Sequence, residues 1–120
     1  MRLLLVTACL LAIPQEKEKL PLKVLYIGNI DTPRGREYVE LFKAAFRECK
    51  GADRKGFDPK TAADFDVVIL DWSQQDQSFR ELTKVASPLG ERDAWTKPTV
   101  LLGSAGLLLA GKWRLSGTWG

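Results

Sequence analysis

The sequence of 120 residues contains no histidine. Histidine is the usual general base of Ser-His and Cys-His nucleophile systems and the commonest metal ligand in proteins. A conventional Ser-His-Asp or Cys-His-Glu triad therefore cannot be assembled within this chain, and zinc or other transition-metal sites are disfavoured for the same reason. Only lysine, tyrosine and carboxylate side chains are left as general bases, and we expect neither a metal nor a cofactor.

Cysteine is also scarce, with only Cys9 and Cys49 in the chain. Cys9 lies in an apolar N-terminal segment, so a mature chain without that segment keeps one thiol and has no internal disulfide. Exported bacterial domains exist without disulfides, and the low count does not contradict export.

An excess of one charge sign is absent too. The chain has 18 basic and 15 acidic residues, a net charge of +3. A nucleic-acid footprint needs basic residues gathered on one face without interleaved acids, so we expect no nucleic-acid partner. Apolar residues make up 45% and charged residues 28%, which is the ordinary balance of a globular protein, and the length fits one domain.

The chain begins with the features of a secretory signal. Met1 and Arg2 precede a largely apolar run over residues 3–13, and a run of about 11 residues is too short to cross a bilayer but typical of a signal peptide. We predict a signal peptide over residues 1–14, a single domain over residues 20–120, and export to the periplasm or the medium, with no membrane span once the signal is removed. The cleavage motif is poor, and the alternative is a cytosolic protein in which residues 3–8 form a buried strand.

Four later segments have the composition of β-strands. Residues 22–28 and 66–71 are almost continuously apolar, which is typical of strands covered on both faces. Pro98 precedes a further strand over residues 99–103. At the start of a strand, the missing N–H of a proline costs no hydrogen bond between strands. Residues 50–53 carry only a weak strand signal.

A long helix is predicted between the first two of these strands. Thr32 and Pro33 are a good N-cap and first helical residue. Apolar residues then recur at spacings of three and four along one helical face: Tyr38, Leu41, Phe42, Ala45, Phe46 and Cys49. Gly51 stands where a glycine commonly ends a helix. Cys49 would lie in the last turn, where the helix dipole raises the pKa of a thiol, and we interpret it as a small core residue.

Shorter helices are predicted over residues 58–63, 79–86 and 107–110. The alternation of strands and helices implies a parallel sheet of four to five strands joined by right-handed crossovers, and so an α/β fold. The ending, with two tryptophans and no evident stop, is also compatible with a product truncated at its C-terminus, which would leave a sheet edge open.

Polar residues follow three of the predicted strands at their carboxyl ends. Ligands of open α/β sheets bind outside these ends, near the point where the strand order reverses. If the first, third and fourth strands are neighbours, their ends form one crevice, in which Trp72 would supply an apolar wall. The predicted ligand-binding residues are as follows: Asn29, Asp31, Asp71, Trp72, Ser73 and Ser104.

Two catalytic alternatives use the same residues. The segment 103–106 (GSAG) is similar to a nucleophile elbow, but it does not match G-x-S-x-G and has no histidine base. Asp31 and Asp71 with Lys97 suggest a phospho-receiver site, but Lys97 precedes a strand, whereas the receiver lysine ends one. We interpret Ser104 as part of a small-residue turn whose N–H groups cap a helix or hold an anion, and the aspartates as turn or helix caps.

Four segments also carry a family resemblance: 23–29 (KVLYIGN), 32–36 (TPRGR), 52–58 (ADRKGFD) and 66–72 (DVVILDW). Together they resemble exported bacterial proteins related to the glutamine-amidotransferase-like superfamily, in its trehalose-utilisation-like branch. The resemblance covers residues 22–110 and implies a flavodoxin-like three-layer sandwich. It implies no amidotransferase site, because the elbow cysteine and the histidine are absent and Ser104 or Ala105 takes the nearest place.

From these observations we expect an exported α/β domain that binds a small polar molecule or a protein partner at the strand ends. A hydrolase with an unconventional Ser/Asp site and a structural module of an envelope assembly are the alternatives. Convergence of Asp31, Asp71 and Ser104 on one concave site would favour binding or catalysis, whereas a filled, flat sheet end would favour the structural role.

Overall fold

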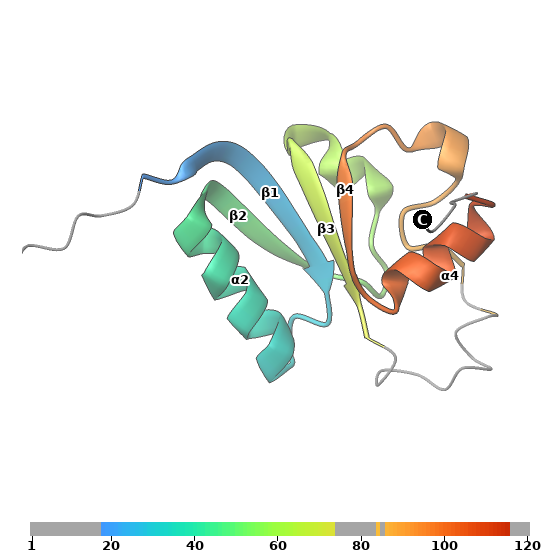
Figure 1. The fold of residues 1–120 in the computed structure, drawn as a ribbon, viewed down its shortest axis with the longest axis horizontal. Helices are drawn as coiled ribbons and strands as arrows, with labels where there is room; N and C mark the ends of the chain where they lie inside the picture. The colour runs from blue at the N-terminus through green and yellow to red at the C-terminus, as the bar shows by residue number, and fades with distance from the viewer. Residues whose placement is uncertain (1–17, 74–83, 85, 116–120) are drawn as a thin grey trace, which may run out of the picture.

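The computed structural model describes residues 18–73, 84 and 86–115. The predicted signal peptide over residues 1–14 and most of the helix expected over residues 79–86 lie outside these ranges. Within them the chain folds into one parallel sheet packed against helices (Figure 1). No helix in the described ranges is long and apolar enough to cross a membrane.

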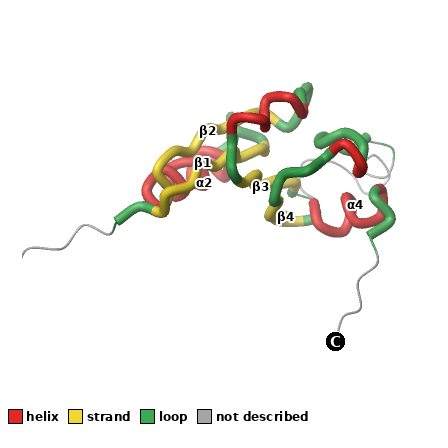
Figure 2. The backbone as a smooth tube through the Cα atoms, turned by 90° about the horizontal axis from the view of Figure 1, so that it is seen from above, coloured by secondary structure: helices red, strands yellow, loops and turns green. Residues whose placement is uncertain are grey.

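The sheet of the described residues has four strands, all parallel, in the order β2-β1-β3-β4. The strands have the following bounds: β1, Leu20–Gly28; β2, Phe46–Asp53; β3, Val67–Trp72; β4, Thr99–Gly103. Seen from above, they follow one another in this order, with β4 at the end of the sheet (Figure 2). The order reverses at β1, which has β2 on one side and β3 on the other. The predicted α/β class with a parallel sheet of four to five strands is confirmed, and the strand order is flavodoxin-like.

Different elements cover the two faces of this sheet. The helix α2, Pro33–Ala45, covers one face through a cluster that includes Tyr26 and Phe42. The 3-10 helix η1, Pro59–Asp64, and the helix α4, Ala105–Lys112, cover the other face. A short 3-10 helix, η3, Arg92–Ala94, lies in the connection to β4. The largest fully buried side chains of the α4 face are mostly aliphatic: Leu25, Ile27, Val68, Leu70, Trp72, Leu89 and Leu109.

The predicted starts of α2 and of the following short helix are confirmed. The Thr32 hydroxyl accepts a hydrogen bond from the Gly35 N–H at 3.2 Å. Pro33 follows at the first helical position, where its missing N–H leaves no bond unmade. The Asp58 carboxylate caps η1 by accepting from the Lys60 N–H at 3.0 Å.

The end of α2 differs from the prediction. The apolar spacing predicts a helix that includes Cys49, but α2 ends at Ala45 and β2 begins at the next residue. Phe46 is already extended, with φ −117° and ψ 156°, and its N–H closes the last helical turn on the Phe42 carbonyl. β2 pairs with most of β1, and these ladder bonds outweigh a helical spacing that is only local. The weak strand predicted at residues 50–53 therefore starts four residues earlier, and Cys49 lies inside it.

Candidate functional site at the carboxyl edge of the sheet

The carboxyl ends of the strands lie on one edge of the sheet, as parallel pairing requires. Trp72 at the end of β3 pairs with Gly103 at the end of β4, and the Ser104 N–H donates to the Trp72 carbonyl at 2.9 Å. Asp71 and Ser104 therefore lie on the same edge. We call this region the carboxyl edge and define it by the residues that end the strands or follow them: 28–31, 53–57, 71–73 and 103–104.

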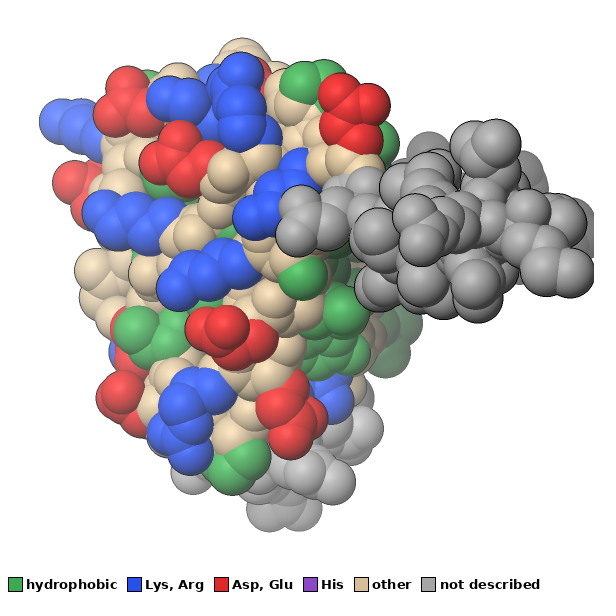
Figure 3. All heavy atoms as spheres, turned by 90° about the vertical axis from the view of Figure 1, so that its left-hand side faces the viewer, with side chains coloured by type: hydrophobic (Ala, Val, Ile, Leu, Met, Phe, Trp, Pro, Cys, Tyr) green, Lys and Arg blue, Asp and Glu red, His purple; other side chains and the backbone are tan. Residues whose placement is uncertain are grey.

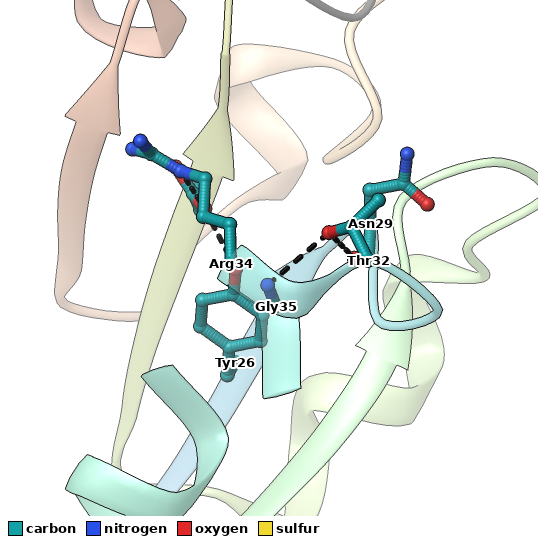
Figure 4. Close-up of polar contacts among 6 residues, drawn as sticks. Tyr26, Asn29, Thr32, Arg34 and Gly35 are labelled. Carbon is teal, nitrogen blue, oxygen red and sulfur yellow. Dashed lines mark hydrogen bonds and ion pairs between the residues drawn. The ribbon is translucent and has the colours of Figure 1, made fainter. Parts of the chain in front are cut away.

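A buried ion pair with a third partner lies at this edge. Asp71 is only 4% exposed, and its Oδ2 accepts a hydrogen bond from the Tyr26 hydroxyl at 2.6 Å. Arg34, in the first turn of α2 and beside Tyr26 (Figure 4), donates Nε to the same oxygen and Nη2 to Oδ1, each at 2.9 Å. A two-point arginine–carboxylate pair of this kind is among the stronger polar contacts in proteins. It joins β1, β3 and α2.

This pairing raises the pKa of two of its members, Tyr26 and Arg34. Burial, followed by the hydrogen bond to Asp71, raises the pKa of Tyr26 far above its usual value. The hydrogen bond to Asp71 also raises the pKa of Arg34, although desolvation opposes it. Tyr26 is therefore a neutral hydrogen-bond donor at physiological pH and does not serve as a general base.

Sequence reasoning missed both partners of Asp71, although Arg34 carries a signal. A cation in the first turn of a helix lies against the positive end of the helix dipole, so its position calls for a carboxylate nearby. Tyr26 carries no such signal, because a tyrosine inside an apolar strand is ordinary. The hydrogen bonds of the Asp71 carboxylate described above go to Tyr26 and Arg34 of the protein itself. A role for this carboxylate in ligand binding stays a prediction.

Trp72 does not form the apolar wall of an open crevice. It has no exposed surface, because side chains alternate along β3 and Trp72 points opposite to Asp71, into the aliphatic cluster. The guanidinium of Arg54 lies over its indole ring, 4.8 Å from the ring centroid. At this point of the carboxyl edge, Arg54 covers the tryptophan.

The other predicted residues lie on the carboxyl edge with different exposures. Asn29 is half-buried, and its carbonyl accepts from the Thr32 hydroxyl at 2.6 Å (Figure 4). Asp31 is exposed, and Ser73 and Ser104 are half-buried. α2 approaches the turn after β1 closely, since a Cβ at Gly35 would clash with the Asn29 carbonyl oxygen.

The two catalytic arrangements considered from the sequence are not formed. The left-handed residue of the turn after β4 is Gly103, with φ 70°. Ser104 itself has an ordinary right-handed conformation, with φ −78° and ψ −5°, so it does not occupy a strained elbow. Lys97 lies at the amino end of β4, where its Nζ donates to the carbonyls of Ala63 and Phe65 at 3.0 and 2.7 Å. It is therefore at the other end of the sheet from Asp71.

A pocket of about 530 Å³ opens beside the end of β2. Arg54 is fixed there, because its N–H donates to the Gly28 carbonyl at 2.8 Å and its side chain is stacked on Trp72, with 6% of the residue exposed. Lys55 beside it is exposed. The lining comes from the turn after β2 and from the connection to β4: Arg54, Lys55, Gly56, Phe57, Pro59, Ala86, Ser87, Pro88 and Gly90. Among the residues that the structure describes, the lining holds two cations and no carboxylate.

Three further pockets in the described structure have mixed charges. One beside the first half of α2 combines Arg34 with Glu37, and another combines Arg36 with Glu40. A third, at the amino end of β1, is lined by two lysines and two carboxylates. Of these surfaces, the pocket beside β2 is the one whose charge suits an anion.

The described ranges contain no site arranged for metal binding or for thiol chemistry. No group of three or more cysteine, aspartate or glutamate side chains there is placed to hold a metal ion. Cys49 is buried in β2, and burial raises the pKa of its thiol. A protonated, buried thiol is a poor nucleophile, which agrees with its interpretation as a small core residue.

Comparisons with known proteins find no match among family models, curated proteins or solved structures. The class of the protein therefore rests on its own architecture, an α/β fold with parallel strands in flavodoxin-like order.

Proposed function

We propose that the chain binds a small organic anion at the carboxyl edge, in the pocket that Arg54 and Lys55 line. The observation that carries this proposal is the presence of two cations and no carboxylate in the described lining. A guanidinium offers a planar fork that matches phosphate or carboxylate oxygens, and a lysine adds a compact charge. The small polar ligand expected from the sequence is thereby narrowed to an anion.

The position of the pocket supports the proposal. Open α/β sheets bind ligands outside the carboxyl ends of their strands, near the reversal of strand order. Here the order reverses at β1. Arg54 follows β2, donates its N–H to Gly28 at the end of β1, and stacks on Trp72 at the end of β3. An anion held by Arg54 would lie beside this reversal.

The shape and rigidity of the pocket indicate an anionic group on a larger body. Its volume of about 530 Å³ is in the range of small-molecule sites and exceeds what a lone phosphate fills. Phe57, Pro59 and Pro88 supply apolar lining. Because Arg54 is already held against Trp72, binding would cost little of its side-chain entropy.

Thermal unfolding with matched probes tests the proposal. The purified full chain is heated with glucose 6-phosphate, inorganic phosphate or neutral glucose over a concentration series. A ligand that binds only the folded state raises its stability with concentration. We expect glucose 6-phosphate to raise the Tm most, phosphate less, and glucose not at all. An unchanged Tm with both anions would refute the proposal.

Two lysine variants distinguish binding in the pocket from a general effect of the protein's net charge. Lys55 lines the pocket, whereas Lys60 is an exposed cation of η1 outside the lining. We expect Lys55→Gln to weaken glucose 6-phosphate binding about tenfold, which corresponds to about 1.4 kcal/mol. Lys60→Gln removes the same charge and should leave the affinity within about twofold. Equal effects of the two substitutions would show that the probe responds to net charge alone.

We further propose that the domain is exported and shares ancestry with the glutamine-amidotransferase-like superfamily. Export is supported by Met1, Arg2 and the apolar run over residues 3–13. Ancestry is supported by segments 23–29 and 66–72, which correspond to most of β1 and β3, and it brings no catalytic residue with it. In its own host the protein should be recovered outside the cytoplasm with an N-terminus between about residues 10 and 18. An intact Met1 on cytoplasmic protein would contradict export.

A further inference from the structure

The outer edge of β4 has no partner strand among the described residues. Backbone hydrogen bonds join Pro98 and Ser104, which flank β4, to β3. Alternate residues of a strand direct their N–H and C=O groups to opposite sides. The backbone groups of Thr99, Leu101 and Gly103 therefore face away from β3. A row of this kind is a template for another strand.

The two edges of the sheet differ in how they are protected. β2, at the far edge, carries exposed charges at Arg47, Glu48 and Lys50. Cations and carboxylates are interspersed over this side of the molecule (Figure 3). Charges on an edge strand are a common device against unwanted pairing. β4 reads Thr-Val-Leu-Leu-Gly, without any charge, and its Val100 is 48% exposed.

We propose that two copies of the chain pair through their β4 edges, antiparallel and related by a two-fold axis. An extended strand is the partner that satisfies alternating N–H and C=O groups along an edge. A two-fold axis at Leu101 places Thr99 opposite Gly103, and it places the exposed Val100 beside Leu102 of the second copy. All of these residues are uncharged, so β4 is its own complement.

A second copy fits this edge better than the other strand edge of the same protein would. Pairing β4 with β2 of another copy would bring the charges of Arg47 and Lys50 to an uncharged, partly apolar strand. Such head-to-tail contacts also do not close and lead to filaments, whereas the two-fold pair is closed. The result would be one continuous sheet of both copies, with their carboxyl edges at opposite ends. This inference does not depend on the anion pocket, which involves no residue of β4.

Sedimentation velocity of the full chain tests the pairing. The protein concentration is varied from about 1 µM to about 500 µM, a range that brackets the dissociation constant expected for a small interface. Over this range we expect the average mass to rise toward twice that of the monomer. In the proposed dimer, Val100→Lys would place a charge beside the apolar Leu102 of the second copy. This variant should therefore stay monomeric over the whole series. Leu41→Lys is the control, because Leu41 is 59% exposed but lies on α2. It should dimerise as the unmodified chain does.

Hydrogen exchange of the unmodified chain locates the contact without relying on a variant. The amides of Thr99, Leu101 and Gly103 should exchange more slowly as the protein concentration rises, because they become bonded in the dimer. Amides of Arg47 and Lys50 in β2 should not respond. A chain that stays monomeric at all concentrations would overturn the proposal, and so would a dimer whose β4 amides are unaffected.

Discussion

The two faces of the carboxyl edge each present an arginine, and the arginines differ in what they meet. On the α2 face, Arg34 is held by both oxygens of the buried Asp71. On the opposite face, Arg54 stacks on Trp72 and lines the pocket beside β2, where the residues that the structure describes include no carboxylate. The contacts of Arg34 join β1, β3 and α2, whereas those of Arg54 place its guanidinium in the lining of a pocket. The sheet thus separates a structural arginine from a candidate binding arginine.

The same division runs through the core. The α2 face is built on stacked rings, with centroids of Tyr26 and Tyr38 5.9 Å apart and those of Tyr38 and Phe42 5.7 Å apart. The opposite face is mostly aliphatic and contains more fully buried side chains. We therefore expect stability to depend most on the aliphatic face, and pH dependence to come from the α2 face.

Adjacent residues of β3 give the largest expected effect and compare the faces directly. Leu70 points to the aliphatic face and is fully buried, while Ile69 points to the α2 face and is 5% exposed. Leu70→Ala should lower the free energy of unfolding by about 4 kcal/mol and Ile69→Ala by about 3 kcal/mol, from lost burial plus a residual cavity. Urea unfolding measures both. Equal losses would remove the difference between the faces, and a loss below about 1 kcal/mol at either residue would mean that β3 is not central.

Asp71→Ala should have the next largest effect. It removes the acceptor of the buried Tyr26 hydroxyl and the partner of Arg34, and we expect the free energy of unfolding to fall by about 3 kcal/mol. The Arg34 side chain is 46% exposed, so water can compensate part of its loss. After correction for folding, glucose 6-phosphate affinity should be unchanged. A weaker affinity would instead place Asp71 in the ligand site, as the sequence suggested.

Tyr26→Phe should have the smallest effect at neutral pH and a distinct one in alkali. Losing its bond to Asp71 should cost about 1–2 kcal/mol. The unfolded tyrosine releases its proton near pH 10, while the raised pKa keeps folded Tyr26 protonated. The unfolded state then binds fewer protons, so stability falls as pH rises above about 10, by up to about 1.4 kcal/mol per pH unit. Urea unfolding between pH 8 and 11 should show a shallower fall for Tyr26→Phe, and identical slopes would exclude this linkage.

The strands that sequence reasoning found are those with a single physical interpretation. Residues 67–70 form an apolar run bounded by Asp66 and Asp71, and a run this short with β-branched side chains favours a buried strand. Residues 46–49 were different, because Phe46 and Cys49 satisfy the helical spacing as well. Their conformation depends on pairing with β1, a contact between segments that local spacing does not contain.

The carboxyl edge was predictable in outline and not in detail. Parallel strands bring their ends together, so the shared edge of Asp71 and Ser104 followed from topology. The burial and the partners of each side chain did not follow from topology, because Asp71 and Trp72 are neighbours that point to opposite faces. Arg54 was missed because a basic residue in a polar turn is usually solvated, and only the fold brings it over the ring of Trp72.

The direct passage from Ala45 at the end of α2 to Phe46 at the start of β2 has a consequence for how the chain tolerates length changes. Without a loop to absorb an added residue, one insertion at this junction would shift β2 along β1 by about 3.3 Å and exchange its two faces. Cys49 would then leave the core and charged neighbours would enter it. Two added residues would restore the alternation. This junction should therefore accept insertions in even steps.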